Sequence, residues 1–181
     1  MGRLCFLAVA TTLTMGASVV HCAETPAALA PEVKRAEQLG RLMLDAEATP
    51  RSSDSEELVS RARGKVSSLC QFEYKPIVAT FDSHRFVFFI AQPPKPDYMV
   101  FGRHFAVDGD NIVASTNTCI AVPPTPPDKP AVAAYITHVL SETPTEFHVY
   151  LSLKHHKPVY VGTSAGNWLV DGDKVSFLGK R

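Results

Sequence analysis

Histidine is the residue type in this chain best able to do chemistry, because its imidazole can bind a metal or move a proton near neutral pH. Two of the histidines are adjacent, His155 and His156, and they are flanked by Lys154 and Lys157, whose charges would repel a divalent cation. No Cys/His spacing typical of a zinc site is present. We therefore predict no metal and no cofactor. The histidines after residue 23 are His84, His104, His138, His148, His155 and His156.

The segment from Gly162 to Gly166 matches the G-x-S-x-G pattern of a hydrolase nucleophile elbow, with Ser164 in the nucleophile position. That elbow needs a helix after the serine and a histidine later in the chain. Residues 168–170 favour a strand instead, and no histidine follows Ser164. The pattern indicates a tight turn between two strands.

The chain shows no credible catalytic set, so the leading hypothesis is a non-enzymatic interaction or binding module. A rival hypothesis is a small exported hydrolase whose site combines His104 or His148 with a nearby acid. The side chains that we single out for contact with a ligand or partner are His148, Tyr150, His155 and His156.

Residues 1–23 have the pattern of a secretory signal peptide. Arg3 precedes an uncharged run over residues 4–20, and a charged, proline-containing segment begins at Glu24. The run is short for a membrane span and rich in small residues, so cleavage after Cys22 or Ala23 is predicted. We expect an exported protein, periplasmic or secreted, without a transmembrane segment in the mature chain. A second alternative is a lipid-anchored envelope protein modified on Cys22.

Cysteine usage agrees with export. Removing the signal peptide takes away Cys5 and leaves Cys70 and Cys119 as the internal pair. In an oxidising compartment such a pair usually bonds, so a Cys70–Cys119 disulfide is predicted, with two free thiols as the alternative.

Composition excludes several classes of protein. Apolar residues make up 45% of the 181 residues and charged residues 20%, as in globular proteins. Lys+Arg and Asp+Glu both number 18, so the chain lacks the basic excess of a nucleic-acid binder. The sequence identifies no partner; a protein of the cell envelope is the one expected for an exported interaction module.

Helical periodicity marks the first part of the mature chain. Residues 24–30 have the composition of a flexible leader. An apolar stripe including Val33, Leu39 and Met43 then predicts a helix that ends before Pro50. A capping box of Ser53 and Glu56 predicts the start of a second helix. Residues 31–69 are thus expected to form a helical hairpin.

Strand patterns fill residues 70–181. Hairpins are predicted for residues 77–90, for residues 98–122 around Asp108-Gly109, and for residues 168–177 around Asp171-Gly172. Residues 85–90 are apolar on both faces, which is typical of a central strand. Residues 147–153 alternate between apolar and polar types, which predicts a half-exposed strand carrying His148 and Tyr150 on its polar face.

The predicted fold is therefore α+β, with an N-terminal helical hairpin packed on a mostly antiparallel sheet of about seven to nine strands. Residues 31–181 would form one domain. The alternative is an all-β sandwich with a loosely attached helical hairpin.

Overall fold

The computed structural model describes residues 22–66, 70–116, 119–124 and 133–180, so the signal-peptide prediction falls almost wholly outside it. The helices within these ranges are α1 (Ala30–Glu47), α2 (Ser53–Arg63) and α3 (Glu146–His155). The strands are β1 (Tyr74–Phe81), β2 (His84–Ala91), β3 (Met99–Phe101), β4 (Phe105–Asp108), β5 (Asn111–Ser115), β6 (Ile120–Val122), β7 (Ala134–Thr137), β8 (Val159–Gly162), β9 (Asn167–Asp171) and β10 (Lys174–Gly179). The α+β class is confirmed.

The strands form three sheets within the described residues, where one was predicted. Their orders are β1-β2-β4-β5, β10-β9-β8-β7 and β3-β6. The chain leaves the extended conformation at Gly102 (φ 122°) and Arg103 (φ 49°), so the strand predicted for residues 98–107 breaks into β3 and β4. These two halves then pair with different partners. All strand pairs are antiparallel except β7 and β8, which are parallel and connected through α3.

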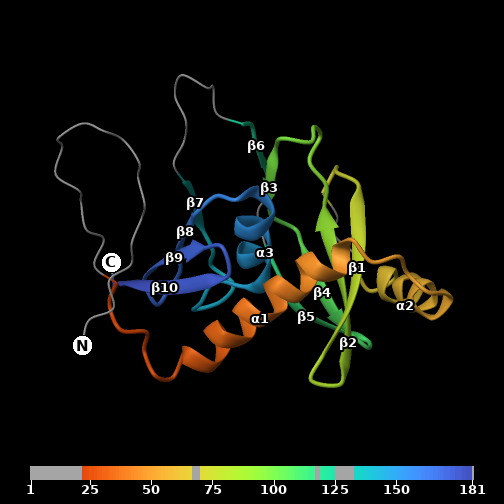
Figure 1. Cartoon of the computed structure of the whole chain (residues 1–181), viewed down its shortest axis with the longest axis horizontal. Coiled ribbons are helices and arrows are strands. Elements are labelled where there is room, and N and C mark those ends of the chain that lie inside the picture. The colour runs from red at the N-terminus through yellow and green to blue at the C-terminus, as the bar shows by residue number, and fades with distance from the viewer. Residues whose placement is uncertain (1–21, 67–69, 117–118, 125–132, 181) are drawn as a thin grey trace.

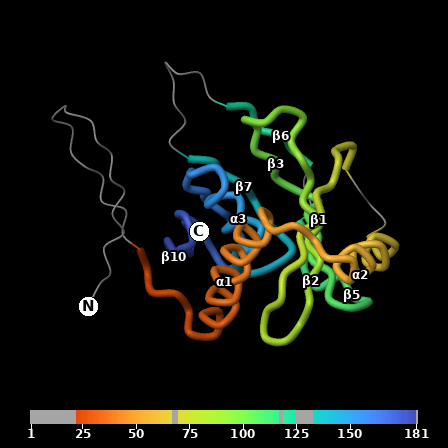
Figure 2. Tube along the Cα trace, turned by 45° about the vertical axis from the view of Figure 1, so that its right-hand side comes forward, coloured from red at the N-terminus to blue at the C-terminus, as the bar shows by residue number. Residues whose placement is uncertain are grey.

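The sheet β1-β2-β4-β5 is covered on both faces, as the apolar run of residues 85–90 indicated. Phe88 on β2 faces the large core formed with α1, α3 and the sheet β7–β10. Phe89, the next residue, faces a smaller core formed with α2. The layers therefore follow the order α2, sheet, α1 with α3, and second sheet (Figures 1 and 2).

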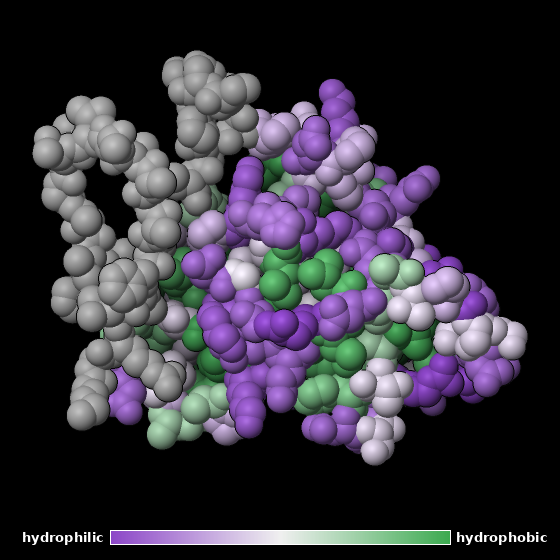
Figure 3. Space-filling view, viewed as in Figure 1, coloured by the Kyte–Doolittle hydropathy of each residue, from purple (hydrophilic) through white to green (hydrophobic). Residues whose placement is uncertain are grey.

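The predicted helical hairpin is not confirmed. The apolar stripe of α1, which includes Leu39 and Met43, packs against α3 and β1 in the large core. The apolar side of α2, with Val59 and Ala62, packs on the opposite face of the sheet. Both stripes are buried as predicted, but they do not meet each other. Polar side chains cover the outer side of α1 (Figure 3).

The helix α2 begins with a different cap from the one predicted. Ser52, not Ser53, is the N-cap, and its Oγ accepts a hydrogen bond of 3.3 Å from the Ser55 backbone N–H. With Ser52 as the N-cap, Ser55 and not Glu56 stands at the N3 position of a capping box, and the Glu56 carboxylate pairs with Arg51 at 2.7 Å. The prediction was thus displaced by one residue, since adjacent serines offer the same chemistry.

The strand predicted for residues 147–153 is wrong, because this segment is α3. Its polar residues are buried together with its apolar ones: His148 is 2% exposed, and Tyr150 and Ser152 are 0% exposed. A helix that is enclosed on all sides has no solvent-facing stripe, so its sequence carries no helical period. The alternation of apolar and polar types therefore misled the prediction.

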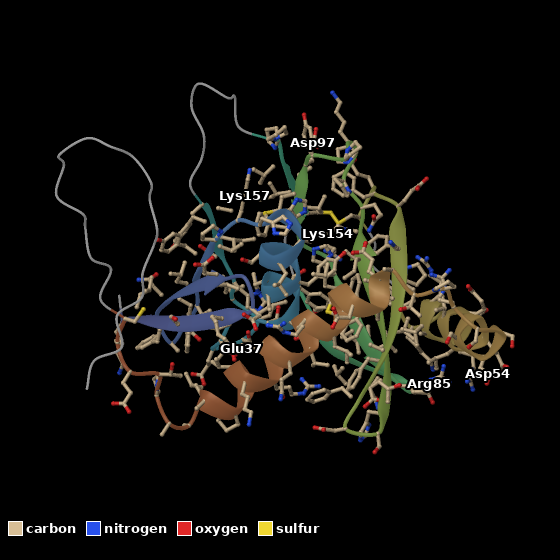
Figure 4. All side chains as sticks on the ribbon, viewed as in Figure 1. Glu37, Asp54, Arg85, Asp97, Lys154 and Lys157 are labelled. Atoms are coloured by element: carbon tan, nitrogen blue, oxygen red, sulfur yellow. A yellow bond between two sulfur atoms is a disulfide. The ribbon has the colours of Figure 1, made fainter. Side chains whose placement is uncertain are left out.

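Helices α1 and α3 approach closely at Gly40. A Cβ at this position would lie 2.5 Å from the Cβ of Val149, a distance that real side chains do not adopt. Beyond this contact, the carboxylate of Glu47 binds Lys154 at 2.7 Å, Lys75 at 3.0 Å and the Tyr150 hydroxyl at 2.9 Å. Lys154 lies at the end of α3 beside the end of α1 (Figure 4). This cluster connects α1, β1 and α3.

The predicted disulfide partners come together. Cys70 and Cys119 lie at disulfide distance, with their Cα atoms 6.1 Å apart. The link joins the segment between α2 and β1 to the segment that leads into β6.

Both Asp-Gly hairpins form as predicted. Gly109 (φ 57°) turns the chain between β4 and β5, and Gly172 (φ 58°) does so between β9 and β10. No helix among the described residues is long and apolar enough to cross a membrane.

Candidate functional site: a cavity of buried histidines beside an open sheet edge

Three histidines from distant parts of the chain meet at one internal space. His104 precedes β4, His138 follows β7, and His148 lies in the first turn of α3. They line a cavity of about 180 Å³, which we call the histidine cavity. Most of the remaining wall is apolar; it consists of Phe101, Gly102, Thr116, Ile136, Thr137, Val139, Phe147 and Leu151.

His104 is a structural member of this wall. Its Nδ1 accepts a hydrogen bond of 3.1 Å from the Ala91 backbone N–H, and its Nε2 donates one of 3.0 Å to the Val100 carbonyl. Burial lowers the pKa of His104 to about 4, so the ring is neutral at pH 7. Both nitrogens are occupied, and the ring joins β2 to the middle of β3.

His148 is fixed through one nitrogen only. Its Nδ1 accepts a hydrogen bond of 3.0 Å from the Thr145 backbone N–H in the capping box of α3. Burial, followed by the nearby rings of His138 and His104, lowers the pKa of His148 to about 3. Nε2 therefore carries the ring proton at neutral pH, and it has no hydrogen-bond partner among the described residues.

His138 lies edge to face against His148, with ring centroids 5.0 Å apart and an interplanar angle of 73°. Its Nε2 is buried and has no hydrogen-bond partner in the described part of the chain. Burial lowers its pKa as well. A buried polar atom without a partner is rare in folded proteins, so this ring is a marker for function.

A second cavity, of about 390 Å³, lies on the other side of His138. One wall is formed by residues 112–115 of β5, and the others come from α1 and from residues 138–146. We call it the β5 groove. Glu146 is buried in its wall, and burial raises the pKa of this carboxyl, with Arg35 acting in the opposite direction.

The strand β5 is an edge that nothing in the described residues covers. It pairs with β4 on one side, and none of its backbone groups bonds elsewhere in these ranges. Ile112 and Val113 on this strand are 43% and 46% exposed. The edges of β1 and β10 are protected: Pro76 lies in β1, and Glu37 accepts a hydrogen bond from the Val175 N–H of β10.

The residues singled out from the sequence do not form one site. His148 lines the histidine cavity, whereas Tyr150 is buried in the Glu47 cluster and its hydroxyl donates to that carboxylate. His155 is the last residue of α3, and His156 caps it in the left-handed conformation (φ 51°). Both lie outside the two cavities.

Ser164 lies in a tight turn between β8 and β9, where Thr163 and Gly166 exchange backbone hydrogen bonds. No helix follows it, so the turn interpretation from the sequence holds. Among the described residues no group of three or more His, Cys, Asp or Glu side chains is arranged to hold a metal ion.

Sequence reasoning counted His138 but gave it no role, and it did not identify the β5 groove. The three cavity histidines come from separate elements, so no local spacing could have linked them. The burial of α3, which brings His148 inward, was hidden by the strand-like alternation.

No known protein family, no curated protein and no solved structure matches this chain.

Proposed function

We propose that this chain is an exported, non-enzymatic interaction module that binds an extended segment of a partner protein along β5. The observation that carries the proposal is the open edge of β5 beside a groove. An unpaired edge offers a row of backbone donors and acceptors to a further strand, a common mode of peptide recognition. The exposed side chains of Ile112 and Val113 supply apolar contact at that edge.

Charge in the groove favours one kind of partner. Arg35 and Glu32 on α1 both line the groove. Arg35 makes no ion pair within the described residues, although its guanidinium lies 5.6 Å from the centre of the Phe86 ring, whereas Glu32 accepts a hydrogen bond of 3.4 Å from the Thr143 hydroxyl. The raised pKa of Glu146 reduces the negative charge that would oppose an acidic group. The proposed partner segment is therefore extended, apolar on alternate residues, and carries a carboxylate.

Export is the second part of the proposal. The uncharged N-terminal run and the disulfide-distance pair Cys70–Cys119 support it. Expression in a secreting bacterial host should give a mature protein that begins after Cys22 or Ala23, as read by mass spectrometry of the N-terminus. A full-length chain in the cytosolic fraction, or a lipidated Cys22, would contradict this part.

Peptide binding tests the interaction itself. The probe is a fluorescent octapeptide of alternating valine and threonine that ends in aspartate, measured by anisotropy. Two controls accompany it: the same peptide ending in asparagine amide, and one with a central proline, which cannot pair along its length. We expect binding of the first peptide, weaker binding of the second and none of the third.

A matched pair of variants locates the binding surface. Ile112→Lys places a charge on the β5 edge, whereas Ile120→Lys places it on β6, where the side chain is 52% exposed. We expect I112K to weaken peptide binding at least about tenfold, since an edge lysine opposes strand addition, and I120K to leave it unchanged. Equal effects of both variants would overturn the proposal. So would turnover of an ester, peptide or glycan panel that His148→Ala abolishes in a folded protein.

A further inference from the structure

The histidine cavity offers polar groups that the fold itself does not use. In His104 both nitrogens are bonded to backbone atoms. The Nε2 atom of His138 is buried and has no partner within the described ranges. The hydrogen bonds of His148 in these ranges are made by Nδ1, and its Nε2 is not among the fully buried unpaired atoms. A folded protein normally pairs a buried polar group, so the unpaired His138 atom at a cavity that His148 also lines points to an occupant.

The hydrogen-bonding role of His148 follows from its partner on the other nitrogen. Because Nδ1 accepts from the Thr145 N–H, the proton of the neutral ring is on Nε2. This nitrogen is therefore a donor, and its complement is an oxygen that accepts. His138 gives no such preference, since either of its nitrogens can carry the proton; a hydroxyl could meet it in both forms.

The size and lining of the cavity limit the ligand further. Its volume of about 180 Å³ is close to that of an engineered cavity of roughly 150 Å³ that binds benzene. Aromatic and aliphatic side chains, including Phe101, Phe147 and Leu151, form most of the wall. A single ring, or a chain of similar volume, fills such a space.

Charge is excluded by the same surroundings. The three histidines are neutral at pH 7, and the wall holds no compensating ionic side chain. An ion that entered the cavity would lose its hydration without a partner of opposite charge. A neutral molecule does not incur this cost.

We propose that the histidine cavity binds a small uncharged ligand, about the size of one six-membered ring, whose single hydroxyl or carbonyl oxygen accepts a hydrogen bond from His148 Nε2. This site is separate from the β5 groove and does not depend on peptide binding there. His138 lines both the histidine cavity and the β5 groove, so a ligand in one would affect binding in the other through this residue.

Calorimetric titration of the mature, oxidised protein with three probes at pH 7 tests the ligand class. Phenol has the required size and oxygen, benzene has the size alone, and benzoate has the size with a charge. We expect phenol to bind about threefold to tenfold more tightly than benzene, as one hydrogen bond supplies, and benzoate not to bind. Absence of phenol binding, or tighter binding of benzoate, would overturn the proposal.

A matched pair of variants on α3 tests the place. Leu151→Phe places a larger side chain in the cavity and so fills part of it. Leu153→Phe makes the same change two residues further along the helix, at a residue that does not line the cavity. L151F should abolish binding of phenol and benzene, and L153F should preserve it, with circular dichroism confirming that both fold. Phenol binding that survives in folded L151F would show that the ligand lies elsewhere and contradict the assignment.

His148→Gln tests the donor without removing the helix cap, because glutamine at this capping-box position can still accept from the Thr145 N–H. We expect H148Q to bind benzene as before and to lose the preference for phenol. An unchanged preference would refute the role of His148. Peptide binding at β5 is measured on the same samples, so failure of the cavity proposal and failure of the proposed function are distinguishable.

Discussion

The two faces of the sheet β1-β2-β4-β5 are both buried, yet they are built differently. The inner face joins α1, α3 and the second sheet in one large core. Among the described residues, the outer face meets α2 and the segment after it, through Val59, Ala62 and Val66. The difference shows that full burial of a side chain does not indicate how many elements depend on it. The inner face holds the architecture together, and the outer face holds one helix.

Phe88 and Phe89 compare the two faces most directly, because they are adjacent on β2 and both 0% exposed. Phe→Ala substitutions in cores cost about 3–5 kcal/mol of unfolding free energy. We expect the loss for Phe88→Ala to lie near the top of this range, because α1 and α3 cannot both move in to fill the space that the ring leaves. The loss for Phe89→Ala should lie near the bottom of the range, since α2 can move toward the sheet without displacing another element. Urea unfolding of both variants measures the difference, and a larger loss for F89A would contradict the comparison.

Lowering the pH should destabilise the protein through the buried histidines His104 and His148. The unfolded chain protonates His104 and His148 near their ordinary pKa of 6.5, whereas the folded chain does so at about 4 and about 3. Between those values the unfolded state binds more protons, so the free energy of unfolding falls as the pH decreases from about 6.5. Each histidine contributes a few kcal/mol to this fall.

Unfolding midpoints at pH 7, 5.5 and 4 measure the effect. His104→Gln should flatten the acid side of the profile, because glutamine keeps a donor and an acceptor but does not titrate. His84→Gln is the control, since His84 is exposed and lies outside the cavity. A profile that is flat in the unmodified protein, or that H84Q changes as much as H104Q, would refute the assignment.

Reduction of Cys70–Cys119 should have a smaller effect, and mainly on the outer side. The bond closes a sequence separation of 49 residues, for which the chain-entropy model gives about 4 kcal/mol as an upper value. We expect Cys70→Ser with Cys119→Ser to lower the melting temperature. In hydrogen exchange, protection should be lost from α2 and β6 more than from α1 and α3. Two thiols titrating in the denatured, unreduced protein would show that the bond is absent.

The smallest effect concerns the start of α2. Ser52→Ala removes the N-cap oxygen and should cost about 1 kcal/mol, whereas Ser53→Ala should cost little. The pair also separates the observed cap from the one that the sequence suggested. Thermal unfolding of the two variants is sufficient, and a greater loss in S53A would restore the capping box of Ser53 and Glu56.

Local patterns were enough to predict α1, α2, the three hairpins and the central place of β2, because each depends on turn chemistry or on one buried face. They did not predict which face of the sheet each helix covers, since the stripes of Leu39 and Ala62 look alike in sequence. They failed for α3, whose polar residues are buried with internal partners such as Glu47 for Tyr150. The clustering of the three cavity histidines could not be predicted from the sequence, because only the long-range topology brings them together.

The placement of α1 has a consequence for the order in which the chain can fold during synthesis. This helix is made first, but its main neighbour, α3, begins about 100 residues after α1 ends. At roughly 5–20 residues per second, the ribosome leaves the apolar stripe of Val33, Leu39 and Met43 without its partner for about 5–20 s. During that interval the nascent chain must stay unfolded or be held by a chaperone. The large core can close only when the last third of the chain has been made, because α3 lies there.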